Sequence, residues 1–244
     1  MTDRPTFILV RPQMGENIGA SARAMCNFGL DRMRIVAPRD GWPNPAATAL
    51  ASGAGRVLDA AVNTDDLPGA LTDSTYDFAT TARSRDLTKP VFSPEAAMQE
   101  AAKRIAEGQH VGVLFGPERA GLENEDIART NAIITVPVNP EYPSLNLAQC
   151  VLLTAYEWRR NSTDVVGQEV EMAGTDWASG AEVEYLARHF EGQLEDTGFF
   201  FPDHKVQSMK ANLRNMWSRM PLTRVDVQML HGLLRQLVRG KHKG

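Results

Sequence analysis

The sequence predicts an α/β domain with a mainly parallel sheet, followed by a small all-helical extension. Over the first 160 residues, short runs rich in β-branched and aromatic residues alternate with helical patterns, which is typical of a parallel sheet covered by helices. After residue 180 only helical patterns remain. We therefore expect an α/β domain over 1–160, an acidic linker over 161–180 and a basic helical extension over 181–244.

Five short apolar runs are the predicted strands of the sheet. Each run is four to seven residues long and is bounded by polar or glycine-containing segments, which favours strands that are buried on both faces. The predicted strands span residues 7–10, 33–37, 77–82, 111–116 and 132–138.

Capping residues and apolar spacing predict the helices between these strands. One helix is expected over 17–28. Another follows the N-cap Ser93, has Pro94 at its first position and ends at Gly108. A third runs over 145–160, because four apolar residues at helical spacing fall on one face. These four are Leu147, Val151, Ala155 and Trp158.

The extension is expected to contain three helices. The first two are predicted near 181–196 and 203–219, with an aromatic turn at 199–201 between them. The last helix opens after Thr223, which can cap it together with Asp226 in an arrangement like a capping box.

The charge of the chain is unevenly distributed. The formal net charge is -4, which by itself argues against a polyanionic partner. Residues 161–200, however, carry nine acidic side chains and one basic one, whereas 201–244 carry nine basic and two acidic ones. Either the basic tail has a partner of its own, or it is a solvated helical face; the charges leave both readings open.

Several features predict a cytoplasmic protein. The apolar run at 7–10 is too short for the core of a signal peptide, and no run approaches the roughly 18 apolar residues of a membrane span. The two cysteines, Cys26 and Cys150, lie in helical patterns without metal or redox spacing, which fits a reducing compartment. We therefore expect no membrane association.

Three segments carry residue types that packing does not require. The first, 15–25, is a helix start rich in small residues with Arg23 among them, although such an arginine is more often a surface residue. The second, 114–122, is a strand that ends in a charged glycine turn, either a ligand site or an ordinary β-turn. The third, 137–148, is a loop with three prolines before a helix whose N-terminal amides suit an anionic group.

Other kinds of site are excluded by the sequence. It contains no phosphate-binding loop of the G-x-x-x-x-G-K-[ST] type, no G-x-G-x-x-G after the first strand, and no histidine or cysteine spacing for zinc. No serine or cysteine has an identifiable base for a nucleophilic triad. We expect a site without metal.

In order and spacing, the three segments resemble the signature motifs of the SPOUT superfamily, in its SpoU/TrmH branch of RNA 2'-O-ribose methyltransferases. ENIGASARAMCNFG is similar to the first motif, LFGPERAGLENEDI to the second and ITVPVNPEYPSLNLAQCV to the third. The loop Thr80–Arg85 and the helical extension resemble those of the TrmJ-type tRNA subgroup. Two positions depart from the pattern, since Pro117 replaces a frequent arginine and Pro143 a frequent serine.

This resemblance implies a fold, a cofactor and an assembly. The α/β domain would be tied in a trefoil knot that holds S-adenosylmethionine, and two copies of the chain would form a homodimer with a shared active site. Ordinary rules of chain connection argue against a knot, so this expectation depends on the resemblance alone. The motif match implies that the cofactor pocket is lined by Thr80, Thr81, Ala82, Gly116, Val136, Ser144 and Leu145.

The resemblance also implies catalytic residues. Arg23 would be the catalytic arginine, with Asn17, Glu118, Ser144 and Asn146 around the reacting centre. Because a guanidinium group is a very weak acid, we expect Arg23 to clamp a phosphate and stabilise the developing oxyanion, while a phosphate oxygen or water accepts the proton.

The expected substrate is the anticodon loop of tRNA, at its 5' edge. The RNA would be bound by Arg23 and Arg85 and, in the extension, by Lys205, Lys210, Arg214 and Arg224. Alternatives are a ribose methyltransferase for rRNA or another tRNA position, a catalytically silent RNA-binding protein of the same fold, and a small-molecule-binding α/β protein. The extension would be an RNA-docking element, or a structural cap in which Phe199–Phe201, Trp217 and Leu222 serve only for packing.

Overall fold

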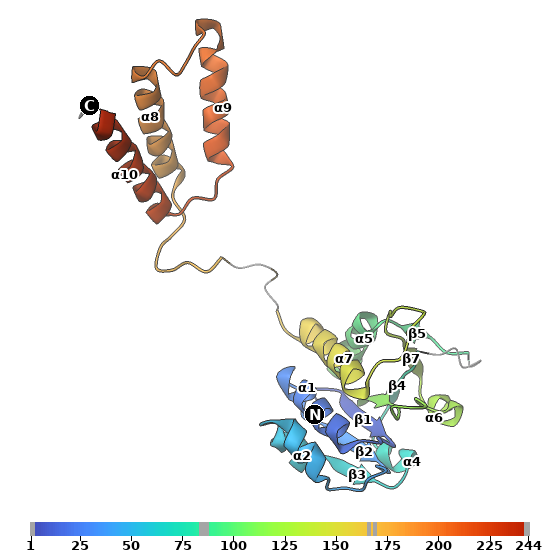
Figure 1. Ribbon diagram of the computed structural model, residues 1–244. Helices are drawn as coiled ribbons and strands as arrows, with labels where there is room; N and C mark the ends of the chain where they lie inside the picture. The colour runs from blue at the N-terminus through green and yellow to red at the C-terminus, as the bar shows by residue number, and fades with distance from the viewer. Residues whose placement is uncertain (1–2, 83–87, 165–166, 168–169, 242–244) are drawn as a thin grey trace. The chain divides into compact units, whose positions relative to one another are not determined.

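The computed structural model describes residues 3–82, 88–164, 167 and 170–241. The chain divides into two compact units, Met1–Val165 and Val166–Gly244 (Figure 1). The first unit contains the sheet and the second contains three helices. Each unit is described separately below.

The sheet of the first unit has seven strands, and every pair of neighbours is parallel. The strand order is β3-β2-β1-β6-β4-β7-β5. The strands are β1 (Thr6–Val10), β2 (Met33–Val36), β3 (Val62–Thr64), β4 (Tyr76–Thr80), β5 (Val91–Phe92), β6 (Val111–Phe115) and β7 (Ala132–Ile134). All five predicted strands and the parallel sheet are confirmed, although β7 ends before the proline-rich loop that the prediction had partly included.

The sequence prediction missed β3 and β5, the two edge strands. They contain only three and two residues, and Val62 and Val91 are 52% and 63% exposed. Such short, half-solvated segments lack the apolar pattern by which a buried strand is recognised.

Helices cover both faces of the sheet. Alternate residues of β1 show this, because Phe7 and Leu9 belong to one core cluster while Ile8 and Val10 belong to another. The first cluster lies under α1 (Gly15–Asn27), α2 (Pro45–Ala51), α3 (Gly55–Asp59), α5 (Pro94–Ala106) and α7 (Leu147–Ser162). The second lies under the short helices α4 (Leu67–Ala70) and α6 (Asn124–Ala128).

The helix predictions for this unit agree with the structure. Ser93 caps α5 by accepting from the Ala96 amide at 3.3 Å, and the predicted apolar stripe of α7 is buried. The structure shows one role of the small residues of α1: a Cβ on Gly19 would lie 2.1 Å from the carbonyl oxygen of Ala47 in α2. The two helices therefore pack in close backbone contact.

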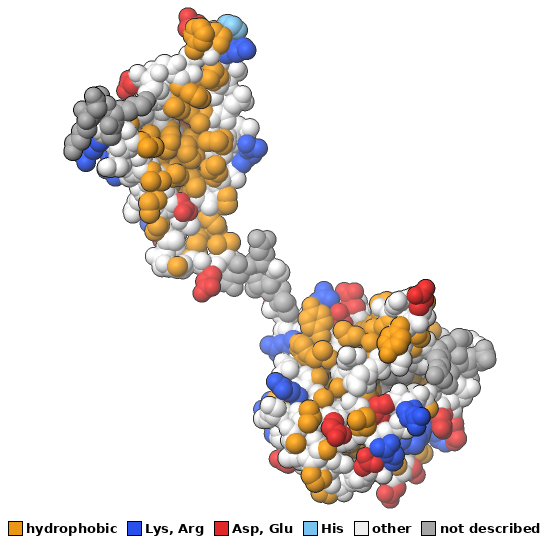
Figure 2. Space-filling model, in the orientation of Figure 1, with side chains coloured by type: hydrophobic (Ala, Val, Ile, Leu, Met, Phe, Trp, Pro, Cys, Tyr) orange, Lys and Arg blue, Asp and Glu red, His pale blue; other side chains and the backbone are white. Residues whose placement is uncertain are grey.

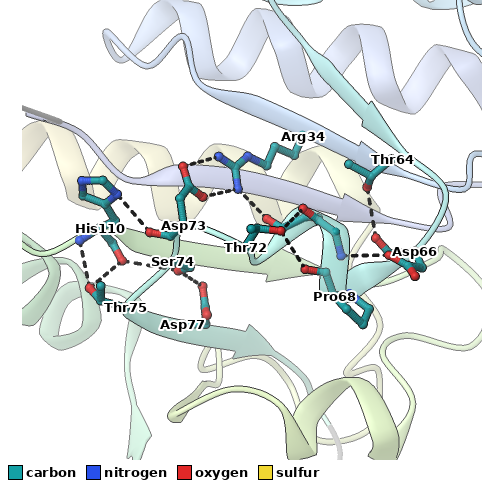
Figure 3. Close-up of polar contacts among 12 residues, drawn as sticks. Arg34, Thr64, Asp66, Pro68, Thr72, Asp73, Ser74, Thr75, Asp77 and His110 are labelled. Carbon is teal, nitrogen blue, oxygen red and sulfur yellow. Dashed lines mark hydrogen bonds and ion pairs between the residues drawn. The ribbon is translucent and has the colours of Figure 1, made fainter.

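A polar network closes the amino-terminal edge of the sheet (Figure 3). Arg34 of β2 donates to both carboxylate oxygens of Asp73, at 2.6 and 2.8 Å, and the His110 ring contacts the Asp73 carbonyl. Ser74 donates to the buried carboxyl of Asp77, whose pKa is raised by burial. This network ties the segments that enter β2, β4 and β6.

The second unit consists of α8 (Gly180–Asp196), a 3-10 turn (Asp203–Lys205), α9 (Val206–Ser218) and α10 (Arg224–Lys241). Figure 1 shows α8 between the other two helices, and it packs against both. Thr223 and Asp226 form the predicted reciprocal cap of α10, with amide-to-side-chain distances of 2.8 and 3.2 Å. Among the helices of the described ranges, none has both the length and the apolar content to cross a membrane.

Candidate functional site

A pocket opens at the carboxyl ends of β4, β6 and β7. Because the three strands are parallel neighbours, the loops that follow them meet at one edge of the sheet. The space inside the pocket is about 170 Å³, and its walls combine apolar side chains with backbone polar groups. It lies where the sequence predicted a ligand crevice.

The structure brings all the predicted cofactor residues to this pocket. Its lining includes Thr80, Thr81, Ala82, Gly116, Val136, Ser144 and Leu145. The Thr80 hydroxyl donates to the Leu114 carbonyl at 2.9 Å, so it joins β4 to β6 as part of the pocket floor. The Ser144 side chain is exposed and makes no hydrogen bond within the described ranges, so its hydroxyl is available to a ligand.

Gly116 lets two backbone segments meet at the pocket wall. A Cβ at this position would lie 2.2 Å from the Leu122 amide nitrogen and 2.5 Å from the Gly121 carbonyl carbon. The turn over 116–122 therefore folds back on the end of β6 too closely for any side chain. This explains why the strand ends in glycine, for which the sequence alone had offered an ordinary turn as an alternative.

Three predicted catalytic residues form one hydrogen-bonded chain beside the pocket. Buried Asn17 donates to Glu118 Oε1 at 2.7 Å and accepts from the Asn146 side-chain amide at 3.0 Å. Glu118 also accepts from the backbone amides of Gln13 and Met14, at 2.8 and 3.3 Å. Glu118 lines the pocket, whereas Asn17 and Asn146 do not line it and are joined to it through Glu118.

The Asn146 side chain also begins α7. Its Oδ1 accepts from the Ala148 amide at 2.8 Å, and the backbone amide of Asn146 donates to the Gln149 side-chain oxygen at 3.2 Å, which completes a capping box. The start of α7, the start of α1 and the 116–122 turn are thus fixed relative to one another.

Arg23 does not reach the pocket of its own chain. It is exposed on α1 and has no hydrogen bond or ion pair within the part of the chain that is described. Asn17 lies six residues earlier, which places the two side chains roughly 120° apart around the helix. The other predicted RNA contact of this unit, Arg85, lies outside the described residues.

Two further features of the site were missed by sequence reasoning. Arg119 lines the pocket, is exposed and has no ion pair among the described residues, so it offers a free cation at the rim. Arg11 forms a bidentate ion pair with buried Asp126, which in turn accepts from the Glu123 amide at 2.8 Å. Arg119 lies within the second quoted motif and could have been identified there. The pair of Arg11 and Asp126 could not, because the two residues are 115 positions apart and no local sequence pattern indicates that they meet.

Cys150 borders the pocket without being a reactive group. Burial raises the pKa of its thiol to about 11, and a hydrogen bond with Thr80 only partly opposes this shift. The thiolate is therefore scarce near neutral pH. Cys150 contributes packing to the pocket wall.

The predicted RNA-binding residues of the second unit are not equivalent. Lys210 pairs with Glu195, Arg214 pairs with Glu191 at 2.8 Å, and Arg224 lies 3.2 Å from Glu182. These acids belong to α8, in the segment that the charge count had described as acidic. Lys205 is exposed and without an acidic partner in the described ranges.

Comparison with known proteins decides the family. Residues 4–156 match the SpoU rRNA Methylase family, and residues 181–244 match the C-terminal domain of the tRNA methyltransferase TrmJ. The chain belongs to the SpoU methylase family. The resemblance stated from the motifs is confirmed, and the SpoU methylase match covers the sheet and the pocket.

Individual relatives extend over nearly the whole chain. The tRNA (cytidine/uridine/adenosine-2'-O-)-methyltransferase TrmJ of Pseudomonas aeruginosa is 33% identical and covers 96% of this chain and 93% of its own length. The tRNA (cytidine/uridine-2'-O-)-methyltransferase TrmJ of Pectobacterium atrosepticum is 34% identical, covering 96% of both chains. The crystal structure of TrmJ from Z. mobilis is 46% identical, with a TM-score of 0.83 over 96% of this chain and 99% of that one.

Proposed function

We propose that this SpoU methylase transfers a methyl group from S-adenosylmethionine to a ribose 2'-hydroxyl of tRNA, at the 5' edge of the anticodon loop. The observation that carries the proposal is the convergence of every motif-matched cofactor residue on one pocket. The names of the full-length relatives support tRNA as the substrate. Action on rRNA or on another tRNA position is the alternative.

The pocket fits the proposed methyl donor. Val136 and Leu145 provide apolar walls, and Gly116 lines the pocket without a side chain. S-adenosylmethionine supplies an activated methyl group on a sulfonium, so we propose that the reaction needs no metal.

The trefoil knot and the boundaries of the 161–180 linker remain predictions.

Residues of this chain would position the ribose 2'-hydroxyl and stabilise the negative charge that develops on its oxygen. Glu118, Asn17 and Asn146 hold the pocket rim, and the free hydroxyl of Ser144 faces the ligand space. We assign to Arg23 the clamping of the neighbouring phosphate and the stabilisation of the developing oxyanion. A phosphate oxygen or water would accept the proton, because a guanidinium group is already protonated.

The position of Arg23 supports a homodimer. Because the Arg23 side chain is exposed and does not line the pocket of its own chain, we propose that it completes the pocket of a second copy. The helix α7, which packs against α1, exposes Leu152, Leu153 and Tyr156, at 40%, 37% and 45% exposure. Burying this apolar face in a two-fold contact would stabilise such a dimer. The substrate and the two free cysteines suit the cytoplasm.

Mapping of ribose methylation tests the proposed function. RNA from a strain that lacks this chain should lose a 2'-O-methyl group in a tRNA anticodon loop, as measured by mass spectrometry. Loss confined to rRNA would support the alternative. Calorimetry should detect stoichiometric binding of S-adenosylmethionine without added metal, and absence of binding at millimolar ligand would contradict the enzyme assignment.

Two measurements test the assembly and the extension. Light scattering should give twice the 26.9 kDa of the chain, and an active monomer would rule out the shared site. A chain that ends near Asn161 should keep cofactor binding but lose tRNA affinity. If the truncated chain had both a lower melting temperature and weaker cofactor binding, the helical unit would instead be a structural cap.

A further inference from the structure

The two seams of the helical unit differ in their charges. In the seam between α8 and α9, Lys210 pairs with Glu195 and Arg214 with Glu191. The Arg214 pair is bidentate, at 2.8 and 3.1 Å, and Glu191 is only 8% exposed. These cations are already neutralised, and a phosphate would have to compete with a fixed carboxylate for them.

Among the described residues, the seam between α8 and α10 has an ion pair at the start of α10, between Arg224 and Glu182, and none beside His189 and His231. The rings of His189 and His231 stack there, with their Nδ1 atoms 2.7 Å apart, and Tyr185 packs against His231 while remaining 70% exposed. Arg235 and Arg239 follow His231 along α10 at steps of four residues, so they share its face. We name this surface, formed by Tyr185, His189, His231, Arg235 and Arg239, the open seam.

Both arginines of the open seam are available to a partner. Arg235 and Arg239 are exposed, and neither has an acidic partner in the ranges described. The one contact of Arg235 is a hydrogen bond from its Nε to the His231 carbonyl at 3.2 Å, which leaves its terminal nitrogens free. Two acids in the N-terminal half of α8 have other partners, since Glu184 pairs with Arg188 and Glu182 with the Ser179 cap.

We propose that the open seam is the RNA-contacting surface of the helical unit, and this inference rests on the proposed function. Arg235 and Arg239 contact consecutive phosphates, because the guanidinium fork matches phosphate oxygens and each contact releases counterions. Tyr185 stacks on an unpaired base, since an exposed aromatic ring beside cations is the arrangement by which proteins bind single-stranded nucleic acid. The RNA face therefore differs from the predicted set Lys205, Lys210, Arg214 and Arg224, of which the last three are ion-paired.

Burial distinguishes aromatic side chains that pack in the core of the helical unit from the exposed one that we assign to RNA binding. Trp217 is 5% exposed and Leu222 packs on the same small core, so both have the structural role that the alternative reading gave them. Tyr185 has the opposite surroundings. Its ring contacts one histidine edge and otherwise faces solvent.

The test compares two double variants of the full-length protein that lose the same charge. Arg235→Gln with Arg239→Gln alters the open seam, and Lys210→Gln with Arg214→Gln alters the ion-paired seam. The probe is an unmodified transcript of the tRNA in which mass spectrometry has located the methyl group, bound at several salt concentrations. The slope of log affinity against log salt should fall by about 1.4 to 1.8 for the first variant, from about 0.7 to 0.9 per phosphate contact. It should stay near the wild-type slope for the second.

A third pair of variants tests the stacking contact. Tyr185→Leu should weaken binding roughly ten-fold without changing the salt slope, whereas Tyr185→Phe, which keeps the ring, should restore affinity. Equal slopes for the two double variants, or equal affinities for Tyr185→Leu and wild type, would overturn the proposal. If wild-type protein bound no tRNA, the proposed substrate itself would be wrong, so the two failures are distinguishable.

Discussion

Two glycines of the α/β unit and two glycines of the helical unit have opposite surroundings. A Cβ on Gly19 or Gly116 would lie 2.1 or 2.2 Å from a backbone atom of another segment, whereas a Cβ on Gly192 or Gly232 would meet nothing within 4 Å. In the α/β unit, Gly19 thus allows α1 to approach the backbone of α2, and Gly116 allows a close turn at the pocket. In the helical unit the same residue type occupies open helix surface and is not required by packing.

Hydrophobic side chains show the same contrast. The sheet is covered on both faces, and its strands β1 and β6 are almost completely buried. The core of the helical unit contains a cluster of four buried hydrophobic residues, while Val225, Met229, Leu233 and Leu237 of α10 are all more than half exposed. Figure 2 shows a band of hydrophobic side chains on the visible face of this unit. The α/β unit thus has a buried sheet with a pocket at one edge, whereas the helical unit has a small core and exposes many hydrophobic side chains.

The largest effect is expected at Arg23. If this side chain acts on the transition state, Arg23→Ala should lower turnover by roughly 100-fold or more while the affinity for S-adenosylmethionine stays nearly unchanged. Single-turnover methylation and calorimetry measure the two quantities. Arg129→Ala removes a surface arginine paired with Glu125 and serves as the control. Full activity of the Arg23 variant would refute its assignment.

The glycine contrast predicts stability effects of opposite sign. Gly116→Ala should destabilise the α/β unit by about 1–3 kcal/mol and weaken cofactor binding, because the added methyl group overlaps the Leu122 amide. Gly232→Ala should stabilise the helical unit by about 0.5–1 kcal/mol, since alanine restricts the unfolded chain and meets no neighbour. Thermal unfolding measures both, and destabilisation by Gly232→Ala would show that the surface of α10 is not open.

Two ion pairs of the α/β unit, one at the carboxyl edge and one at the amino edge of the sheet, predict different effects of mutation on cofactor binding. Arg11→Met should weaken cofactor binding several-fold, because the pair of Arg11 with Asp126 anchors the segment that follows the pocket turn. Arg34→Met breaks a similar bidentate pair with Asp73 at the opposite edge (Figure 3). It should lower the melting temperature without changing cofactor affinity. Equal losses of affinity in the two variants would show that Arg11 acts only through global stability.

The smallest effect concerns pH and the helical unit. Burial, followed by His189 and Arg235, lowers the pKa of His231 below its usual value of 6.5, and Tyr185 packs on its other side. Because the folded state then takes up a proton less readily than the unfolded chain, stability is complete above about pH 6.5 and decreases as the pH falls below it. Circular dichroism between pH 8 and 5 should follow this loss. His231→Phe should remove it, whereas His204→Phe should leave it intact.

Local patterns were sufficient for the parts of the fold whose residues lie close together in the chain. The stripe Leu147, Val151, Ala155 and Trp158 predicted the buried face of α7, and the Ser93 cap predicted the start of α5. The pocket residues were predictable because two of the quoted motifs and the loop Thr80–Arg85 contain them, and strands of one parallel sheet deliver their following loops to one edge. Only the family resemblance, however, indicated which of these residues line a cofactor pocket.

The sequence by itself determined the parallel sheet, the helical extension and two loops of the pocket, 114–122 and 137–148, because apolar periodicity and caps act over a few residues. The tertiary structure alone decided which charges are neutralised. Arg11 meets Asp126 across 115 positions, and Arg214 meets Glu191 across 23, since strand order and helix packing bring them together. A count of charges cannot distinguish paired Arg214 from unpaired Arg239, because the partner of a charged side chain depends on the folded neighbours and not on the composition of its segment.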